Sequence, residues 1–184
     1  MKVFLRYFLE IPFPIKEIDR VITELPGEWL DLAARDANLR GLLMLGALPT
    51  DEPDLSAGDL CVSISAPEVE GTLLRRALQW LTIRGDAHQP VLQGDLELAE
   101  LGPSRTQLAL SAQYRPSAHV AQSSDRMMAQ RVGESTLKAF VDRLADYVQT
   151  IAGEPSAVPA GPANWSAAVK TVGFGLSPGW LAAP

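Results

Sequence analysis

Hydrophobic and polar residues alternate at the beginning of the chain. Over residues 2–11 one face carries only apolar or aromatic side chains, namely Val3, Leu5, Tyr7, Leu9 and Ile11. A period of two in a β-branched and aromatic stretch predicts a strand with one buried face. Pro12 and Pro14 end this strand, because proline has no N–H to donate to a sheet. A helix is expected from Pro14 to Leu25, and a second, short helix at about 28–37.

The middle of the chain returns to patterns typical of strands. We expect strands at 39–48, 60–66, 72–83, 91–101 and 105–115. The segments between them are rich in Gly, Pro, Asp and Ser, which favour turns. Because no long helix separates these strands, neighbouring strands should be antiparallel and connected as hairpins.

The strongest periodicity lies near the C-terminus. From Ser123 or Ser124 to Ala152, apolar residues recur at steps of three to five residues. This spacing predicts one long amphipathic helix with a single buried face. Glu134 and Lys138 are four residues apart and are expected to pair on the solvent side. Gly153 and Pro155 supply the helix stop.

The composition changes after the long helix. Residues 153–184 are rich in Gly and Pro, and Glu154 and Lys170 are the charged residues there. We therefore expect a helical and β-sheet domain over residues 1–152 and a C-terminal tail over 153–184. The tail carries Trp165, Phe174 and Trp180, so docking on its own domain or on a partner stays open.

Composition excludes several functional classes. The 184 residues carry a formal net charge of −6, which argues against a nucleic-acid-binding surface. One cysteine and two histidines exclude a disulfide framework and a cysteine-based zinc site, so no metal and no cofactor is expected. Neither a glycine-rich phosphate loop nor a G-x-S-x-G elbow is present. No apolar run reaches the length of a membrane-spanning helix and the N-terminus is too charged for a signal peptide, which predicts a cytoplasmic protein.

Several segments resemble the START-like helix-grip superfamily (SRPBCC), which includes birch-pollen-allergen-like proteins and polyketide cyclases. They are Ala77–Trp80, Val91–Leu98, Leu108–Pro116 and the helical run that begins at Asp125. The resemblance covers residues 1–152 and is to an uncharacterised bacterial branch. It implies an α+β fold in which a curved antiparallel sheet grips the long C-terminal helix, with two short helices after the first strand and an apolar cavity between sheet and helix. It carries over no fixed catalytic set.

Six residues are candidates for contact with a ligand in that cavity: Trp80, Tyr114, His119, Met128, Arg131 and Ser135. Trp80, Tyr114 and Met128 are equally compatible with ordinary core positions. Arg131 lies near the edge of the apolar stripe, where it either anchors an anionic group or pairs with Glu134. His119 precedes the long helix and either gates the cavity or lies on the surface. Cys61 lies in an apolar strand pattern and is expected to be buried.

Two classes of function follow from this pattern. The first is binding or transport of a small hydrophobic molecule, such as a lipid, an isoprenoid or an aromatic metabolite. The alternative is a cyclase- or hydrolase-like enzyme acting on a hydrophobic substrate in the same cavity, with Tyr114, Glu134 or His119 as acid or base. The expected partner is the small ligand. A homodimer or a partner recruited by the tail remains open, whereas nucleic acid and an integral membrane segment are not expected.

Overall fold

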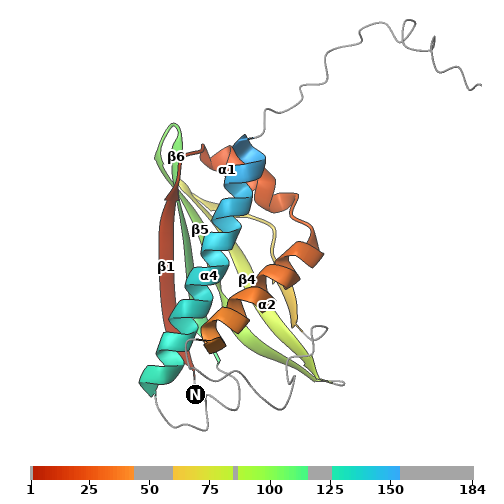
Figure 1. Ribbon diagram of the computed structural model, residues 1–184. Helices are drawn as coiled ribbons and strands as arrows, with labels where there is room; N and C mark the ends of the chain where they lie inside the picture. Colours follow the sequence, from red (N-terminus) through yellow and green to blue (C-terminus); the bar gives the residue numbers. More distant parts are fainter. Residues whose placement is uncertain (1, 44–59, 85–86, 116–125, 154–184) are drawn as a thin grey trace, which may run out of the picture. The chain divides into compact units, whose positions relative to one another are not determined.

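A computed structural model describes residues 2–43, 60–84, 87–115 and 126–153. Its elements belong to one unit that covers Met1–Glu154 (Figure 1). The strands are β1 (Val3–Ile11), β2 (Leu60–Ile64), β3 (Glu68–Glu70), β4 (Leu73–Arg84), β5 (Ala87–Gly102) and β6 (Arg105–Tyr114). The helices are α1 (Ile15–Thr23), α2 (Gly27–Leu43) and α4 (Arg126–Gly153).

The strands form one six-stranded antiparallel sheet. Its order is β1-β6-β5-β4-β2, and the short strand β3 also pairs with β4. Strands β4, β5 and β6 follow one another as hairpins, while β1 pairs with β6, so the first and last strands of the chain lie side by side. Helix α4 lies across one face of the sheet, and α1 and α2 lie on the same side (Figure 1). The predicted helix-grip α+β architecture is therefore confirmed.

The main error of the sequence interpretation lies after residue 38. A strand was expected at 39–48, but α2 continues to Leu43, and residues 44–48 lie outside the described part of the chain. The helix buries residues from Leu30 to Gly41 at helical spacing. A short apolar run such as Leu39–Leu43 does not distinguish strand from helix by itself. Strand β3 was not predicted because three residues, all exposed, carry no period.

Two glycines allow elements to approach closely. A Cβ atom on Gly94 in β5 would collide with the carbonyl oxygen of Ser111, where β5 pairs with β6. A Cβ atom on Gly133 in α4 would lie 2.6 Å from Leu5 Cδ1 and 2.9 Å from the Tyr114 ring. Glycine in a strand or helix interior weakens that element, so its value lies in the approach it permits. Gly133 lets α4 lie directly against β1 and β6.

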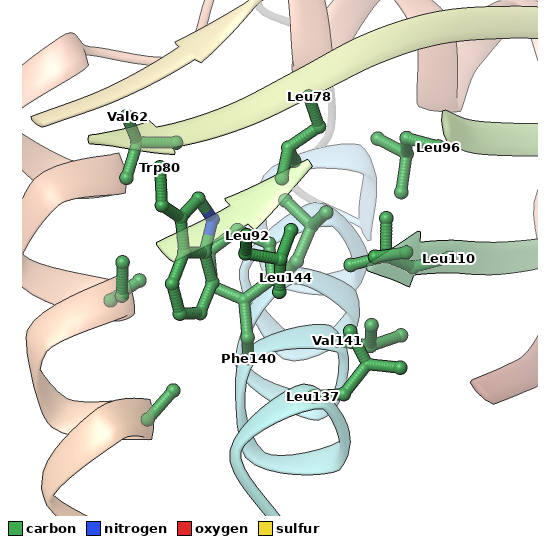
Figure 2. Close-up of a cluster of buried hydrophobic side chains, with 14 of the residues drawn as sticks. Val62, Leu78, Trp80, Leu92, Leu96, Leu110, Leu137, Phe140, Val141 and Leu144 are labelled. Carbon is green, nitrogen blue, oxygen red and sulfur yellow. The ribbon is translucent and has the colours of Figure 1, made fainter. Parts of the chain in front are cut away.

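The space between α4 and the middle of the sheet is filled by large apolar side chains. Trp80 from β4 meets Phe140 from α4 edge-on, with ring centroids 4.9 Å apart and both side chains fully buried. Leucine and valine side chains from the sheet and α4 surround this pair (Figure 2): Val62, Leu78, Leu92, Leu96, Leu110, Leu137, Val141 and Leu144. Figure 2 shows them converging from both layers, as in an ordinary close-packed core.

A buried charge ties α1 to the same face of the sheet. Arg76 in β4 is 4% exposed and donates to Asp19 Oδ1 through Nε at 3.1 Å and through a terminal nitrogen at 2.5 Å. Its guanidinium also donates to Thr23 Oγ1 and to the carbonyl oxygen of Ser65. A buried guanidinium is tolerated only when its donors are occupied, and here carboxylate, hydroxyl and carbonyl oxygens accept from it.

Candidate functional site

The aromatic candidates from the sequence lie inside the packed core. Trp80 is fully buried and Tyr114 is 1% exposed. Neither side chain lines the groove or the smaller hollow described below. Trp80 Nε1 has no hydrogen-bond partner among the described residues. A role for these two side chains in ligand binding stays a prediction.

Tyr114 is part of a small polar cluster between β6, α2 and α4. Its hydroxyl donates to Asn38 Oδ1 at 3.4 Å, a long hydrogen bond, and Asn38 is itself 8% exposed. The nearby Thr136 hydroxyl is buried without a hydrogen-bond partner in the described part of the chain. Burial raises the pKa of Tyr114 to about 12, against a smaller lowering contribution from Thr136. The phenol therefore keeps its proton to a higher pH than an exposed tyrosine does, because the apolar surroundings disfavour its anion.

An open groove lies at the margin of the sheet, between β1 and the N-terminal half of α4. Its volume is about 630 Å³. Four consecutive β1 residues and one face of α4 line it: Phe4, Leu5, Arg6, Tyr7, Gln130, Arg131, Glu134, Ser135, Leu137 and Lys138. Apolar side chains from both elements are thus combined with three cationic groups and one carboxylate. Ligand sites combine apolar contacts with polar groups that orient the ligand, and this groove offers both, with polar and charged residues in the majority.

One side of the groove is held by a hydrogen-bonded network. The Tyr7 hydroxyl donates to Asp142 Oδ1 at 2.9 Å, and Lys138 Nζ donates to Asp142 Oδ2 at 2.5 Å and to the Tyr7 hydroxyl at 3.2 Å. These bonds, first the one with Asp142 and then the one with Tyr7, raise the pKa of Lys138. The expected Glu134–Lys138 pair is therefore wrong: Lys138 reaches Asp142 one turn further on, and Glu134 accepts from Gln130 Nε2 at 2.9 Å.

Arg131 and Ser135 were both named from the sequence, and both line the groove. They lie four residues apart, on one face of α4. Arg131 is exposed, and no carboxylate among the described residues pairs with it. Within this part of the chain its guanidinium therefore has donors left over for an anionic group. Met128 is half-buried one turn earlier and does not line the groove.

The β1 side of the groove was not found from the sequence. Phe4 and Arg6 lie on the face of the first strand opposite its buried face, and neither was among the candidate site residues. Tyr7 was assigned to the buried face, and its hydroxyl reaches Asp142 at the edge of that face. One feature of the sequence points to this side of the strand: two aromatic residues, Phe4 and Phe8, share it with charged residues, and both are exposed in the structure.

A second, smaller hollow of about 370 Å³ lies over β2, β4 and β5. It is lined by Ser63, Ile64, Ser65, Ala77, Leu78, Gln79, Gln93 and Gly94. Its side chains are small or uncharged, and Ser65 Oγ already accepts the N–H of Ala77 at 2.9 Å. It offers no charged group to orient a ligand.

Two further expectations concern reactive side chains. Cys61 is exposed, contrary to the prediction, because the pairing of Val62 with Trp80 turns Leu60 and Val62 inward and Cys61 outward. His119 lies outside the described residues, as does the tail apart from Gly153. Within the described residues no group of His, Cys, Asp and Glu side chains is arranged to hold a metal ion. None of the helices described is long and apolar enough to cross a membrane.

Comparison with known proteins gives similarity at the level of structure. No family model and no curated protein matches the sequence. Similar solved structures include a protein from Thermus thermophilus, TTHA0849, with 10% identity over 81% of this chain and 99% of that chain (TM-score 0.41). A START superfamily protein from Mycobacterium smegmatis has 13% identity over 80% and 98% (TM-score 0.37). The Zhui aromatase/cyclase from Streptomyces sp. R1128 has 14% identity over 83% and 94% (TM-score 0.33).

The chain has the helix-grip fold. This assignment rests on the strand order and on the placement of α1, α2 and α4 against one face of the sheet. The resemblance of the sequence to START-like proteins is thereby confirmed for the fold. A fold of this kind hosts many functions, so the fold alone does not determine what this protein binds or does.

Proposed function

We propose that this protein binds a small amphipathic molecule, with an apolar body and an anionic end, in the groove between β1 and α4. The observation that carries the proposal is the Arg131 guanidinium, which has no carboxylate partner in the described part of the chain and lies in a groove also lined by Phe4, Leu5 and Leu137. The lipid, isoprenoid and aromatic ligands expected from the sequence all supply an apolar body. Because the groove also carries cationic side chains, we expect a ligand of these classes that ends in a carboxylate or a similar anionic group.

The charges of the groove support this choice. Arg6, Arg131 and Lys138 line it together with a single carboxylate, Glu134, on a protein whose formal net charge is −6. Lys138 and Glu134 already have partners, and Arg6 lies 3.7 Å from Glu97. Arg131 therefore retains the most hydrogen-bonding capacity for a ligand. A charge-assisted hydrogen bond contributes roughly 1.5–3 kcal/mol, which is about a tenfold to hundredfold change in affinity.

Dodecanoate and dodecanol test the proposal, because they share an apolar chain and differ in the end group. We expect dodecanoate to raise the melting temperature and to bind in calorimetry, and dodecanol to bind more weakly. The variant Arg131→Gln should lower dodecanoate affinity about tenfold and leave dodecanol unchanged. Arg126→Gln is the matched control, since Arg126 is exposed on the same helix and does not line the groove.

Two results would overturn the proposal. One is the absence of any thermal shift with dodecanoate. The other is an equal loss of affinity in the Arg126→Gln and Arg131→Gln variants, which would indicate general charge attraction and no site. The catalytic alternative remains a sequence prediction: Glu134 is exposed and bonded to Gln130, and the structure adds no observation that favours it.

A further inference from the structure

The two edge strands of the sheet, β1 and β2, differ in length and in what covers their outer side. The β2 edge is short, with five residues, and α2 covers it: Asp31 Oδ1 accepts the backbone N–H of Val62 at 2.7 Å. The β1 edge runs over nine residues, and among the described residues no backbone hydrogen bond forms on its outer side. Proteins normally shorten, cover or charge a sheet edge, because open N–H and C=O groups pair with other strands.

The identity of the open backbone groups follows from the pairing of the neighbouring strands. Arg115 donates its N–H to the carbonyl oxygen of Val91 at 2.8 Å, so odd-numbered residues of this strand face β5. Backbone groups alternate sides along a strand, and even-numbered β6 residues therefore face β1. The register places Leu110 opposite Tyr7, which directs the odd residues of β1 toward β6. The N–H and C=O groups of Phe4, Arg6, Phe8 and Glu10 consequently face outward.

The side chains of these same four residues lie on the outer face of the sheet. Phe4 is 68% exposed and Phe8 is 59% exposed, and they flank Arg6 on the strand. No proline and no lysine interrupts the strand between Val3 and Ile11. The edge therefore joins open hydrogen-bonding groups to an apolar and charged outer face.

We propose that β1 pairs with the β1 strand of a second copy of this chain, antiparallel and centred on Phe8. In this register the open groups of Phe8 bond to those of the second Phe8, and Arg6 of each copy lies opposite Glu10 of the other. The two Arg6–Glu10 pairs are the charge complementarity that selects this register and this occupant. A shift that placed Arg6 opposite Arg6 would juxtapose like charges, which is destabilising across strands.

The existing partners of these charges leave room for the intermolecular pairs. Arg6 lies 3.7 Å from Glu97, and Glu10 lies 3.7 Å from Arg105. Both distances exceed a normal hydrogen bond, and the side chains of Arg6 and Glu10 are each 58% exposed. The proposed dimer requires no rearrangement of buried groups. The paired segment includes Leu5, Arg6 and Tyr7, which also line the groove, whereas Arg131 on α4 lies outside it.

Oligomeric state across the micromolar range tests the proposal, measured by light scattering and analytical ultracentrifugation on the full chain. We expect a mass of twice 19.9 kDa at high concentration. Phe8→Lys should give a monomer with unchanged circular dichroism and melting temperature, because Phe8 is exposed and does not line the groove. Val69→Lys, on the exposed strand β3, is the matched control and should remain dimeric.

A charge exchange tests the register. Arg6→Glu and Glu10→Arg should each weaken the dimer at least about tenfold, and the double variant should restore it. The double variant inverts both intramolecular neighbours, placing Glu beside Glu97 and Arg beside Arg105, so restoration cannot come from within one chain. A monomeric wild-type protein, a dimer that survives Phe8→Lys, or a double variant that stays monomeric would each overturn the proposal. A dimer that is lost only when residues 154–184 are deleted would instead assign the contact to the tail.

Discussion

The layer between the sheet and α4 differs sharply between its middle and its β1 margin. In the middle, Trp80 and Phe140 meet edge-on and are fully buried. At the margin, Phe4 from the sheet and Lys138 from the helix are exposed around a groove of about 630 Å³. The same helix and the same sheet thus border a filled core and an open groove.

The contrast between the filled middle and the open margin shows where side chains leave space between the sheet and α4. A cavity in the centre requires that the inward-facing positions carry small side chains, and here they carry tryptophan, phenylalanine and leucine. At the margin, β1 is the last strand of the sheet, and Phe4 is 68% exposed there. The groove is therefore a consequence of the sheet edge, and the filled centre is a consequence of side-chain volume.

Phe140→Ala probes the filled centre and has the largest expected effect. We expect a loss of about 3–5 kcal/mol in the free energy of unfolding, because the substitution removes a buried ring and leaves a cavity. Phe4→Ala is the control at the margin and should change stability by less than about 0.5 kcal/mol, since Phe4 is 68% exposed. Denaturant unfolding measures both.

The cavity itself gives a second readout for the same variant. Benzene should stabilise Phe140→Ala and leave the wild-type protein unchanged, because apolar cavities stay dry and accept small apolar molecules. An equal benzene effect on both proteins would contradict a filled centre.

Much of this architecture could be predicted from periodicity. The strand at 2–11, the hairpins between residues 72 and 115 and the helix that ends at Gly153 each repeat a clear pattern over many residues. The extension of α2 through Gly41 could not be predicted from periodicity. Glycine is a poor helix former, and Gly41 is buried against Thr136, which lies far away in the sequence. Tertiary packing there overrides local propensity.

Asp19→Ala compares a buried ion pair with an exposed one and should have the next largest effect. It leaves the Arg76 guanidinium, 4% exposed, without its carboxylate; because Asp19 is itself 24% exposed, we expect a loss of about 1.5–3 kcal/mol. Asp142→Ala removes the partner of Lys138 at the groove and should cost less than about 1 kcal/mol, because water solvates the freed lysine. Denaturant unfolding measures both variants. Equal losses in the free energy of unfolding would contradict the idea that burial makes the Arg76–Asp19 pair more important for stability than the Lys138–Asp142 pair.

The α4 side of the groove could be predicted from the sequence, whereas the β1 side could not. Arg131 and Ser135 share a helix face near the apolar stripe, which a period of 3.6 residues reveals. The β1 wall depends on which strand ends the sheet, and strand order is set by long-range pairing such as Tyr7 with Leu110. Arg76 with Asp19 is similar: residues 57 positions apart carry no local sign of their contact.

Tyr114→Phe tests the polar cluster that lies between the two regions, with the smallest effect at neutral pH. Removing the long hydrogen bond to Asn38 should cost about 0.5–1 kcal/mol there. Burial raises the pKa of Tyr114 to about 12 in the folded protein, against about 10 in the unfolded chain. Between these values the folded state holds the proton and the unfolded state has released it, so stability falls as the pH rises from about 10 to about 12.

The phenylalanine variant lacks this ionisation and should lose less stability over the same interval. The difference between the two proteins, by up to about 3 kcal/mol, isolates Tyr114, because all other titratable groups are common to both proteins. Unfolding in denaturant at several pH values from 8 to about 12 measures it, with the tyrosinate absorbance of the folded protein as an independent reading. If the free energies of unfolding of the two proteins changed with pH in parallel, the Tyr114 hydroxyl would have to reach water. The filled core would then end on the inner side of β6 and exclude this hydroxyl.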